Sequence, residues 1–307
     1  MRRFLPAAPA VALLILLTSC SSGSGGGGGS TTTFVPGKWT VTLFLSNNGN
    51  LGPVVEVDMN LTQTGTTISS NSDNTVDNRV CGGIHTDSTT GTVNGSQFNL
   101  VISINAETAT LTGTLSADGK SIDTLNSKVS SSSGGPCFLG DSGGFSGNFV
   151  PPLTGTLTGP MQIPGLPTAP TVTAMLDEDS SFNVTGSMVV TNDPCFSSLT
   201  TTADNPGMSI GSLSSFEMTD GTNTLEFMGI VQVAPGLPNS YNAGFTVSAG
   251  CTQESGTMEL NFDSAAAVAR ASGATSNSTS AASRINPVLV ERLNALRVAR
   301  HAHHDAP

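Results

Sequence analysis

The stretch Val55-Glu56-Val57-Asp58-Met59-Asn60-Leu61 decides the fold of this chain. Apolar and polar side chains alternate strictly along it, which is the pattern of a β-strand with one buried face and one wet face. We therefore expect Glu56 and Asp58 to lie on the wet face. The strand is followed by Gln63-Thr64-Gly65, which predicts a turn into a return strand that starts at Thr67.

The same kind of pattern recurs on both sides of this stretch. In the first half of the chain, Asn94-Gly95 between two alternating segments is typical of a two-residue hairpin turn. The second half repeats the plan with less regular alternation. Strands are expected at residues 39–45, 55–61, 98–104, 109–115, 143–149, 171–176, 181–184, 224–231, 244–247 and 256–262.

The cysteines indicate that one domain is present twice. Cys81 and Cys137 are 56 positions apart, Cys195 and Cys251 are also 56 apart, and each member of the second pair follows its counterpart by 114. Four cysteines allow three pairings, and the equal spacing favours the disulfides Cys81–Cys137 and Cys195–Cys251. Each bridge would stabilise its domain by roughly 4 kcal/mol on the chain-entropy model. A metal site is the rival interpretation, but no C-x-x-C pair or nearby histidine cluster supports it.

Many short strands joined by tight turns predict an all-β protein. We expect two tandem antiparallel up-and-down β-barrels, because closure leaves no unpaired sheet edge. Gly37-Lys38-Trp39 and the glycine-rich final strand at 143–149 resemble the layout of lipocalin-like and avidin-like barrels. This resemblance is architectural and implies no ligand-binding residues. Two β-sandwiches, or a single larger barrel shared between the copies, remain alternatives.

The N-terminus carries an export signal. Met1-Arg2-Arg3 is positively charged, and residues 7–17 are apolar apart from one proline. This segment is shorter than the ~20 residues of a spanning helix, which favours a cleaved signal peptide over residues 1–19. Leu17-Thr18-Ser19-Cys20 resembles the bacterial lipobox, which implies that Cys20 receives a diacylglyceryl group and becomes the mature N-terminus. An ordinary secretory signal with an incidental cysteine is the alternative.

The remaining domain boundaries follow from composition. Residues 20–33 are rich in Gly and Ser and predict a flexible tether. The β domains are expected at 34–150 and 151–263, and residues 264–307 form a linker and a short Arg-rich helix. The resemblance to lipoproteins of Gram-negative bacteria implies an outer-membrane destination, because Ser21 and not Asp follows Cys20.

The tail has two interpretations. Asn286-Pro287 is a helix start signal, and an apolar stripe at helical spacing follows it. The stripe consists of Leu289, Leu293 and Leu296, and the helix also carries Arg292, Arg297 and Arg300. It is either a cationic helix for a membrane surface or an acidic partner, or a disordered extension without function.

Charge excludes one class of partner. Residues 34–263 contain 20 acidic residues against four basic ones, and residues 151–263 contain no Lys or Arg. The basic residues are Lys38, Arg79, Lys120 and Lys128. Such an acidic body repels the phosphates of nucleic acids, so we expect no nucleic-acid partner.

No motif predicts catalysis. Gly140-Asp141-Ser142-Gly143-Gly144 matches the nucleophile motif of trypsin-like serine proteases, but a triad also needs a histidine base. His85 is the one histidine in the two repeats, and it is in the wrong context. Glu254-Ser255-Gly256 stands at the same place in the second repeat, which indicates a recurring turn. We therefore expect no catalytic residue.

Two clusters have metal-ligating chemistry. Asp177-Glu178-Asp179 offers carboxylates for calcium, but it lacks the alternating ligands of a dedicated loop and is interpreted as a solvated hairpin tip. His301, His303 and His304 with Asp305 offer a terminal site for a soft divalent ion. We expect neither metal nor cofactor.

These features together predict a bacterial envelope lipoprotein in a binding or structural role. Its expected partners are the lipid anchor's membrane and a small molecule or an envelope component. A secreted or surface hydrolase with an acidic site is the alternative.

Overall fold

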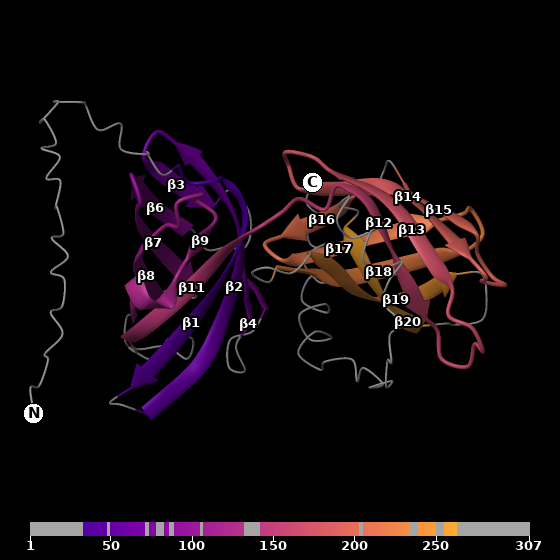
Figure 1. Ribbon diagram of the computed structural model, residues 1–307, viewed down its shortest axis with the longest axis horizontal. Helices are drawn as coiled ribbons and strands as arrows, with labels where there is room; N and C mark the ends of the chain where they lie inside the picture. Colours follow the sequence, from indigo (N-terminus) through magenta and orange to yellow (C-terminus); the bar gives the residue numbers. More distant parts are fainter. Residues whose placement is uncertain are drawn as a thin grey trace, which may run out of the picture. The chain divides into compact units, whose positions relative to one another are not determined.

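A computed structural model describes most of the chain between residues 33 and 262 (Figure 1). The described ranges are 33–47, 50–70, 74–77, 83–85, 89–104, 107–131, 142–202, 205–233, 239–249 and 255–262. All of them belong to one compact unit. Almost all of their regular structure is antiparallel β, with one short 3-10 helix, η1 (Thr124–Asn126).

The first eight-stranded barrel closes through the pairing of β1 with both β11 and β2. The ring runs in the order β1-β11-β10-β8-β7-β6-β3-β2. Its strands are β1 (Gly37–Asn47), β2 (Asn50–Thr64), β3 (Thr67–Ser70), β6 (Thr89–Asn94), β7 (Gln97–Ile104), β8 (Glu107–Thr114), β10 (Lys128–Ser131) and β11 (Ser142–Val150). Outside the ring, β4 (Asn74–Asp77) pairs with β2 and with β5 (Gly83–His85), and β9 (Ser121–Ile122) pairs with β11.

The second barrel also has eight strands and closes through β13 and β14. Its ring runs in the order β13-β12-β20-β19-β18-β17-β15-β14. The strands are β12 (Gly155–Gln162), β13 (Thr171–Glu178), β14 (Asn183–Thr191), β15 (Ser198–Thr201), β17 (Leu213–Thr219), β18 (Thr224–Gln232), β19 (Ser240–Ala249) and β20 (Ser255–Phe262). A short extra strand, β16 (Gly207–Ile210), pairs with β14 and β17. Two tandem antiparallel barrels are thus confirmed, and the sandwich and shared-barrel alternatives are wrong.

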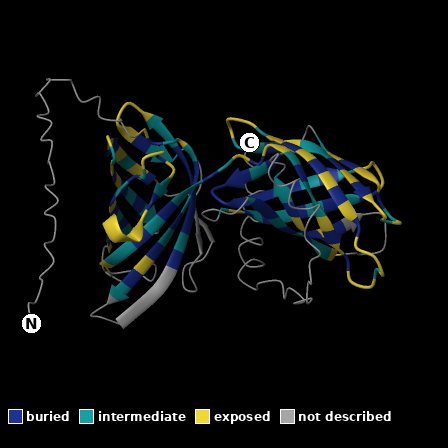
Figure 2. Cartoon of the chain, in the orientation of Figure 1, coloured by how far each residue is buried: buried dark blue, intermediate teal, exposed yellow. Residues whose placement is uncertain are grey.

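Alternation along the strands builds both cores, and it is visible as the checkered burial in Figure 2. Trp39 of β1 lies opposite Met59 of β2, and both side chains are buried inside the first barrel. The predicted turn at Asn94-Gly95 is confirmed, since Gly95 has a φ of +59° between β6 and β7. The turn after β13 is longer than its counterpart after β2, so β14 begins at Asn183 and not at Ser181 as expected.

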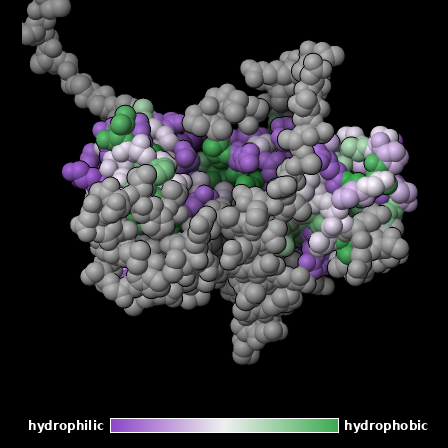
Figure 3. All heavy atoms as spheres, turned by 90° about the horizontal axis from the view of Figure 1, so that it is seen from below, coloured by the Kyte–Doolittle hydropathy of each residue, from purple (hydrophilic) through white to green (hydrophobic). Residues whose placement is uncertain are grey.

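The described surface offers few large apolar side chains. Figure 3 shows hydrophilic and near-neutral residues interspersed with small hydrophobic patches. The exposed large hydrophobic residues are Phe44, Leu125, Met175 and Val189. Within the described ranges, no helix is long and apolar enough to cross a membrane.

Candidate functional site

Aromatic and aliphatic side chains fill the interior of the first barrel among the residues that the structure describes. Phe34 stacks on Trp39 at a ring centroid distance of 5.1 Å, and Phe98 lies 6.3 Å from Trp39. Around these rings, Val41 and Leu111 have no surface that a water molecule can reach. The walls of a hollow barrel would keep such surface, so these inward-facing residues fill the space where a lipocalin-like barrel would hold a ligand.

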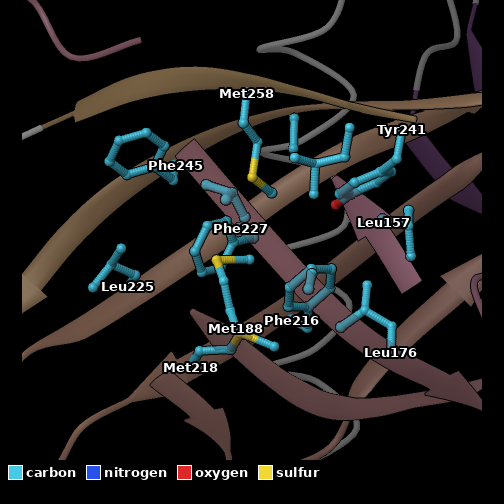
Figure 4. Packing of buried hydrophobic residues seen from close by; sticks show 14 of the residues in the cluster. Leu157, Leu176, Met188, Phe216, Met218, Leu225, Phe227, Tyr241, Phe245 and Met258 are labelled. Carbon is cyan, nitrogen blue, oxygen red and sulfur yellow. The ribbon is translucent and has the colours of Figure 1, made fainter. Parts of the chain in front are cut away.

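The second barrel is filled in the same way (Figure 4). The rings of Phe216 and Phe227 stack with their centroids 5.3 Å apart. The Phe216 centroid lies 6.0 Å from that of Tyr241, and the Phe245 centroid lies 6.0 Å from that of Phe227. Methionines complete the packing, and their flexible thioether chains suit irregular gaps. The buried ones are Met161, Met188, Met218 and Met258.

One polar pair lies inside the second barrel. The fully buried Tyr241 hydroxyl is 3.0 Å from the Ser214 hydroxyl, so each group satisfies the other. Burial raises the pKa of the Tyr241 phenol, which therefore stays protonated at neutral pH. The pair is a satisfied hydrogen bond in the core, and its geometry does not suit a general acid or general base.

A group of buried charged and polar residues lies between the two barrels, and we call it the inter-barrel cluster. It consists of Lys38, Asp58 and Asn60 from β1 and β2, Glu178 from β13, and residues 209–212, which are the end of β16 and the turn into β17. Lys38 stands opposite Asn60 in the β1–β2 register, and both point away from the interior of the first barrel. The Lys38 Nζ donates to Glu178 Oε2 at 2.6 Å and to Ser209 Oγ at 3.0 Å.

Polar side chains of the first barrel cap the turn of the second. Gly211 N donates to Asn60 Oδ1 at 3.0 Å, and Ser212 N donates to Asp58 Oδ1 at 2.7 Å. In return, Asn60 Nδ2 donates to the Ser209 carbonyl at 2.9 Å. The backbone of the turn is therefore hydrogen-bonded by groups that precede it by about 150 residues.

Burial decides the chemistry of this cluster. Desolvation lowers the pKa of Lys38 below 10.5, while the charges of Glu178 and Asp58 and the hydrogen bond to Glu178 act in the opposite direction. The side chains of Lys38 and Glu178 are both only 2% exposed. A substrate cannot reach the amine without separation of the barrels, so the geometry is that of a structural ion pair.

Two expectations from the sequence are wrong here. Asp58 was expected on a wet face but is 2% exposed, and Glu178 was expected in a solvated hairpin tip. Alternation separates the side of a strand that faces its own barrel from the side that does not. It cannot tell that a second barrel covers the outer side. Lys38 was the sequence feature that could have indicated this cluster. It is one of few cations in an acidic body, and a buried cation needs a carboxylate partner.

The expected hairpin tip is real at Asp179, which is exposed. Asp179 Oδ1 accepts from Ser181 N at 2.7 Å and from Asn183 N at 2.9 Å, and Asn183 Nδ2 donates to the other oxygen. The side-chain bond from Asn183 contributes most to lowering the pKa of Asp179. Because Glu178 turns into the inter-barrel cluster and Asp179 closes the turn, the triplet does not form a calcium site. In the part of the chain that the structure describes, no group of three or more His, Cys, Asp or Glu residues is arranged to hold a metal ion.

The protease-like motif is explained by strand packing. Ser142 opens β11, where it pairs with Ser46 of β1 and Ser130 of β10. A Cβ atom at Gly143 would lie 1.9 Å from the Phe44 carbonyl oxygen, so glycine is required by the close approach of two strands. His85 belongs to β5, which joins the ring only through β4 and β2. Gly140 and Asp141 lie outside the described residues.

The other predicted site residues are not tested. Cys20, Cys81, Cys137 and Cys251 lie outside the described residues, as does the terminal cluster His301, His303, His304 and Asp305. Cys195 lies between β14 and β15 and is half-buried. The two disulfides and the lipid on Cys20 therefore stay predictions.

Comparison with known proteins gives no family. No family model matches the chain, and no curated protein matches it significantly. Among solved structures, a protein of unknown function from the DUF3598 family of Nostoc punctiforme is 10% identical, with a TM-score of 0.25 over 76% of this chain and 98% of the other. A Nitrosomonas europaea protein with the provisional name AttH is 11% identical, with a TM-score of 0.21 over 74% of this chain and 92% of the other. Likenesses at this level carry no argument about function.

Proposed function

We propose that this chain is an envelope lipoprotein whose two barrels serve as a solid structural or protein-binding body. Acyl chains on Cys20 hold it to the membrane, and residues 20–33 keep the barrels clear of the surface. The observation that supports the structural or protein-binding role is the filled interior of both barrels.

Small-molecule sites are usually concave cavities of roughly 300–1,000 Å³ with a few polar groups directed into them. In these barrels that space is occupied by Trp39, Phe98 and Phe145 in the first and by Phe216, Phe227 and Tyr241 in the second. Recognition of an envelope component would therefore use the outer faces or the loops. A hydrolase gains no support from the described residues, because the carboxylates with shifted pKa among them, at Asp118, Asp179 and Asp220, are all shifted downward and all lie at exposed turns.

Membrane attachment rests on the sequence. A single acyl chain gives only marginal membrane binding, and stable anchoring takes two signals. The diacylglyceryl group implied at Cys20 supplies two acyl chains. The flexible Gly/Ser tether that follows lets the barrels lie at a distance from the membrane without fixing their orientation.

Mass spectrometry of the mature protein from a Gram-negative host tests the anchor, with a Cys20→Ser variant as control. We expect the mature chain to begin at Cys20, to carry a diacylglyceryl group, and to fractionate with the outer membrane. The Cys20→Ser chain should carry no lipid and leave the membrane fraction. A wild-type chain that lacks residues 1–19 but bears no lipid on Cys20 would contradict the proposal.

A further inference from the structure

The β16–β17 hairpin has apolar side chains that face away from the interior of its own barrel. Phe216 and Met218 of β17 pack into the core of the second barrel, so Leu213 and Ser215, at odd positions, face outward. Leu213 is nevertheless only 1% exposed and forms a small separate cluster with the equally buried Ile210. The outer side of this hairpin is therefore covered.

The first barrel contacts the tip of this hairpin. Gly211, at the tip of the hairpin, has a φ of +55°, and a Cβ atom there would lie 2.5 Å from both Cβ and Oδ1 of Asp58. Only glycine fits so close a contact in this backbone conformation. The tip is then fixed by the hydrogen bonds from Gly211 and Ser212 to Asn60 and Asp58.

The connection between the barrels takes part in the same contact. Only residues 151–154 separate β11 from β12. Leu153 N donates to Glu178 Oε2 at 2.8 Å, the same oxygen that accepts from Lys38 Nζ. Unfolding of the first barrel would remove Lys38, the partner of Glu178, and would uncap the hairpin tip by removing Asn60 and Asp58.

We propose that the outer face of β1 and β2 is a docking site for the β16–β17 hairpin tip, and that this docking makes the two barrels unfold as one cooperative unit. Domains joined only by a linker unfold separately, each at its own stability. Docked domains share the free energy of their interface, so a loss of stability in one lowers the resistance of the other to denaturant.

The chain carries a natural probe for each barrel. It has a single Trp and a single Tyr. Trp39 is fully buried in the first barrel and Tyr241 is fully buried in the second. Trp39 emission, excited where only indole absorbs, and the tyrosine bands of the second-derivative absorbance spectrum therefore report the two barrels separately during the denaturation of one sample.

The test is denaturant unfolding of the full oxidised chain in a mild detergent, followed with both probes. Three glycine variants separate docking from local strain. Gly211→Ala adds a methyl group into the contact with Asp58, whereas Gly221→Ala and Gly95→Ala add one at turns with positive φ where nothing lies within 4 Å. Asn60→Ala removes the hydrogen bonds that the first barrel makes to Ser209 and Gly211.

In the wild type we expect the Trp39 and Tyr241 transitions to coincide. Gly221→Ala, in the second barrel, should shift both transitions to lower denaturant together, and Gly95→Ala, in the first, should do the same. In Gly211→Ala and Asn60→Ala the two transitions should separate. Two wild-type transitions with different midpoints would overturn the proposal. So would a Gly221→Ala shift confined to Tyr241, or transitions that still coincide in both docking variants.

Discussion

Lys38 and Glu178 are 140 residues apart in the sequence, yet Lys38 Nζ lies 2.6 Å from Glu178 Oε2 in an ion pair with almost no exposure to solvent. One belongs to the first strand of the first barrel and the other to the second strand of the second. The pair joins two filled barrels and has no route for a substrate. Its energetics are therefore those of a buried structural contact.

Removal of the cation alone should be costly. Lys38→Met leaves the Glu178 carboxylate buried without its counterion, and we expect a loss of about 3–5 kcal/mol in the free energy of unfolding. The double variant Lys38→Met/Glu178→Gln should regain most of that loss, because Gln keeps an acceptor for Leu153 N and carries no charge. Urea denaturation measures both variants. A single variant as stable as the wild type would show that the pair is solvated.

The pH dependence of the pair has a defined sign. Because the pKa of Lys38 is lowered in the folded chain, the unfolded chain binds more protons between that lowered pKa and 10.5. The free energy of unfolding of the wild type, relative to the Lys38→Met/Glu178→Gln variant, should therefore rise with pH across this window. The comparison cancels the effect of Tyr241, which both chains share. A relative stability that falls as the pH approaches 10.5 would contradict the lowered pKa.

The exposed turn at Asp220 should respond to acid. Asp220 Oδ1 accepts from Asn223 N at 2.6 Å and from Thr222 N at 2.8 Å, and hydrogen bonds from Asn223 contribute most to lowering its pKa. The contribution of the ionised Asp220 to stability is complete above pH 3.8, the ordinary pKa of an Asp carboxyl, and it is lost as the pH falls through the lowered pKa. Asp220→Ala should thus be less stable than the wild type at pH 6, with the difference shrinking toward pH 2. Thermal unfolding across that range measures it, and a constant difference would argue against ionised Asp220 as the acceptor.

The cysteine spacing leads to a separate prediction. Peptide mapping of the unreduced chain should recover Cys81 linked to Cys137 and Cys195 linked to Cys251. Replacement of Cys195 and Cys251 together by Ser should lower the free energy of unfolding by roughly 4 kcal/mol. Links between the first and second pairs would contradict the duplication on which the pairing depends.

Local sequence patterns were sufficient to predict the barrels. Alternation at Val55, Val57 and Met59 identified the inward face of β2, and Asn94-Gly95 identified a hairpin. The inter-barrel cluster could not be found in this way, because the burial of Asp58 depends on a turn more than 150 residues later. The filling of the interiors was equally hidden, since the same alternating residues line a hollow barrel and pack a solid one.

The most direct test of a filled-barrel body is a titration of the native, lipid-free chain with a long-chain fatty acid and with an anilinonaphthalene dye. Trp39 emission and dye fluorescence report entry into a barrel. We predict no saturable change in either signal at ligand concentrations that leave the chain folded. Saturable binding with a stoichiometry of one ligand per barrel, and with a shift of Trp39 emission, would show a hollow interior and contradict the account.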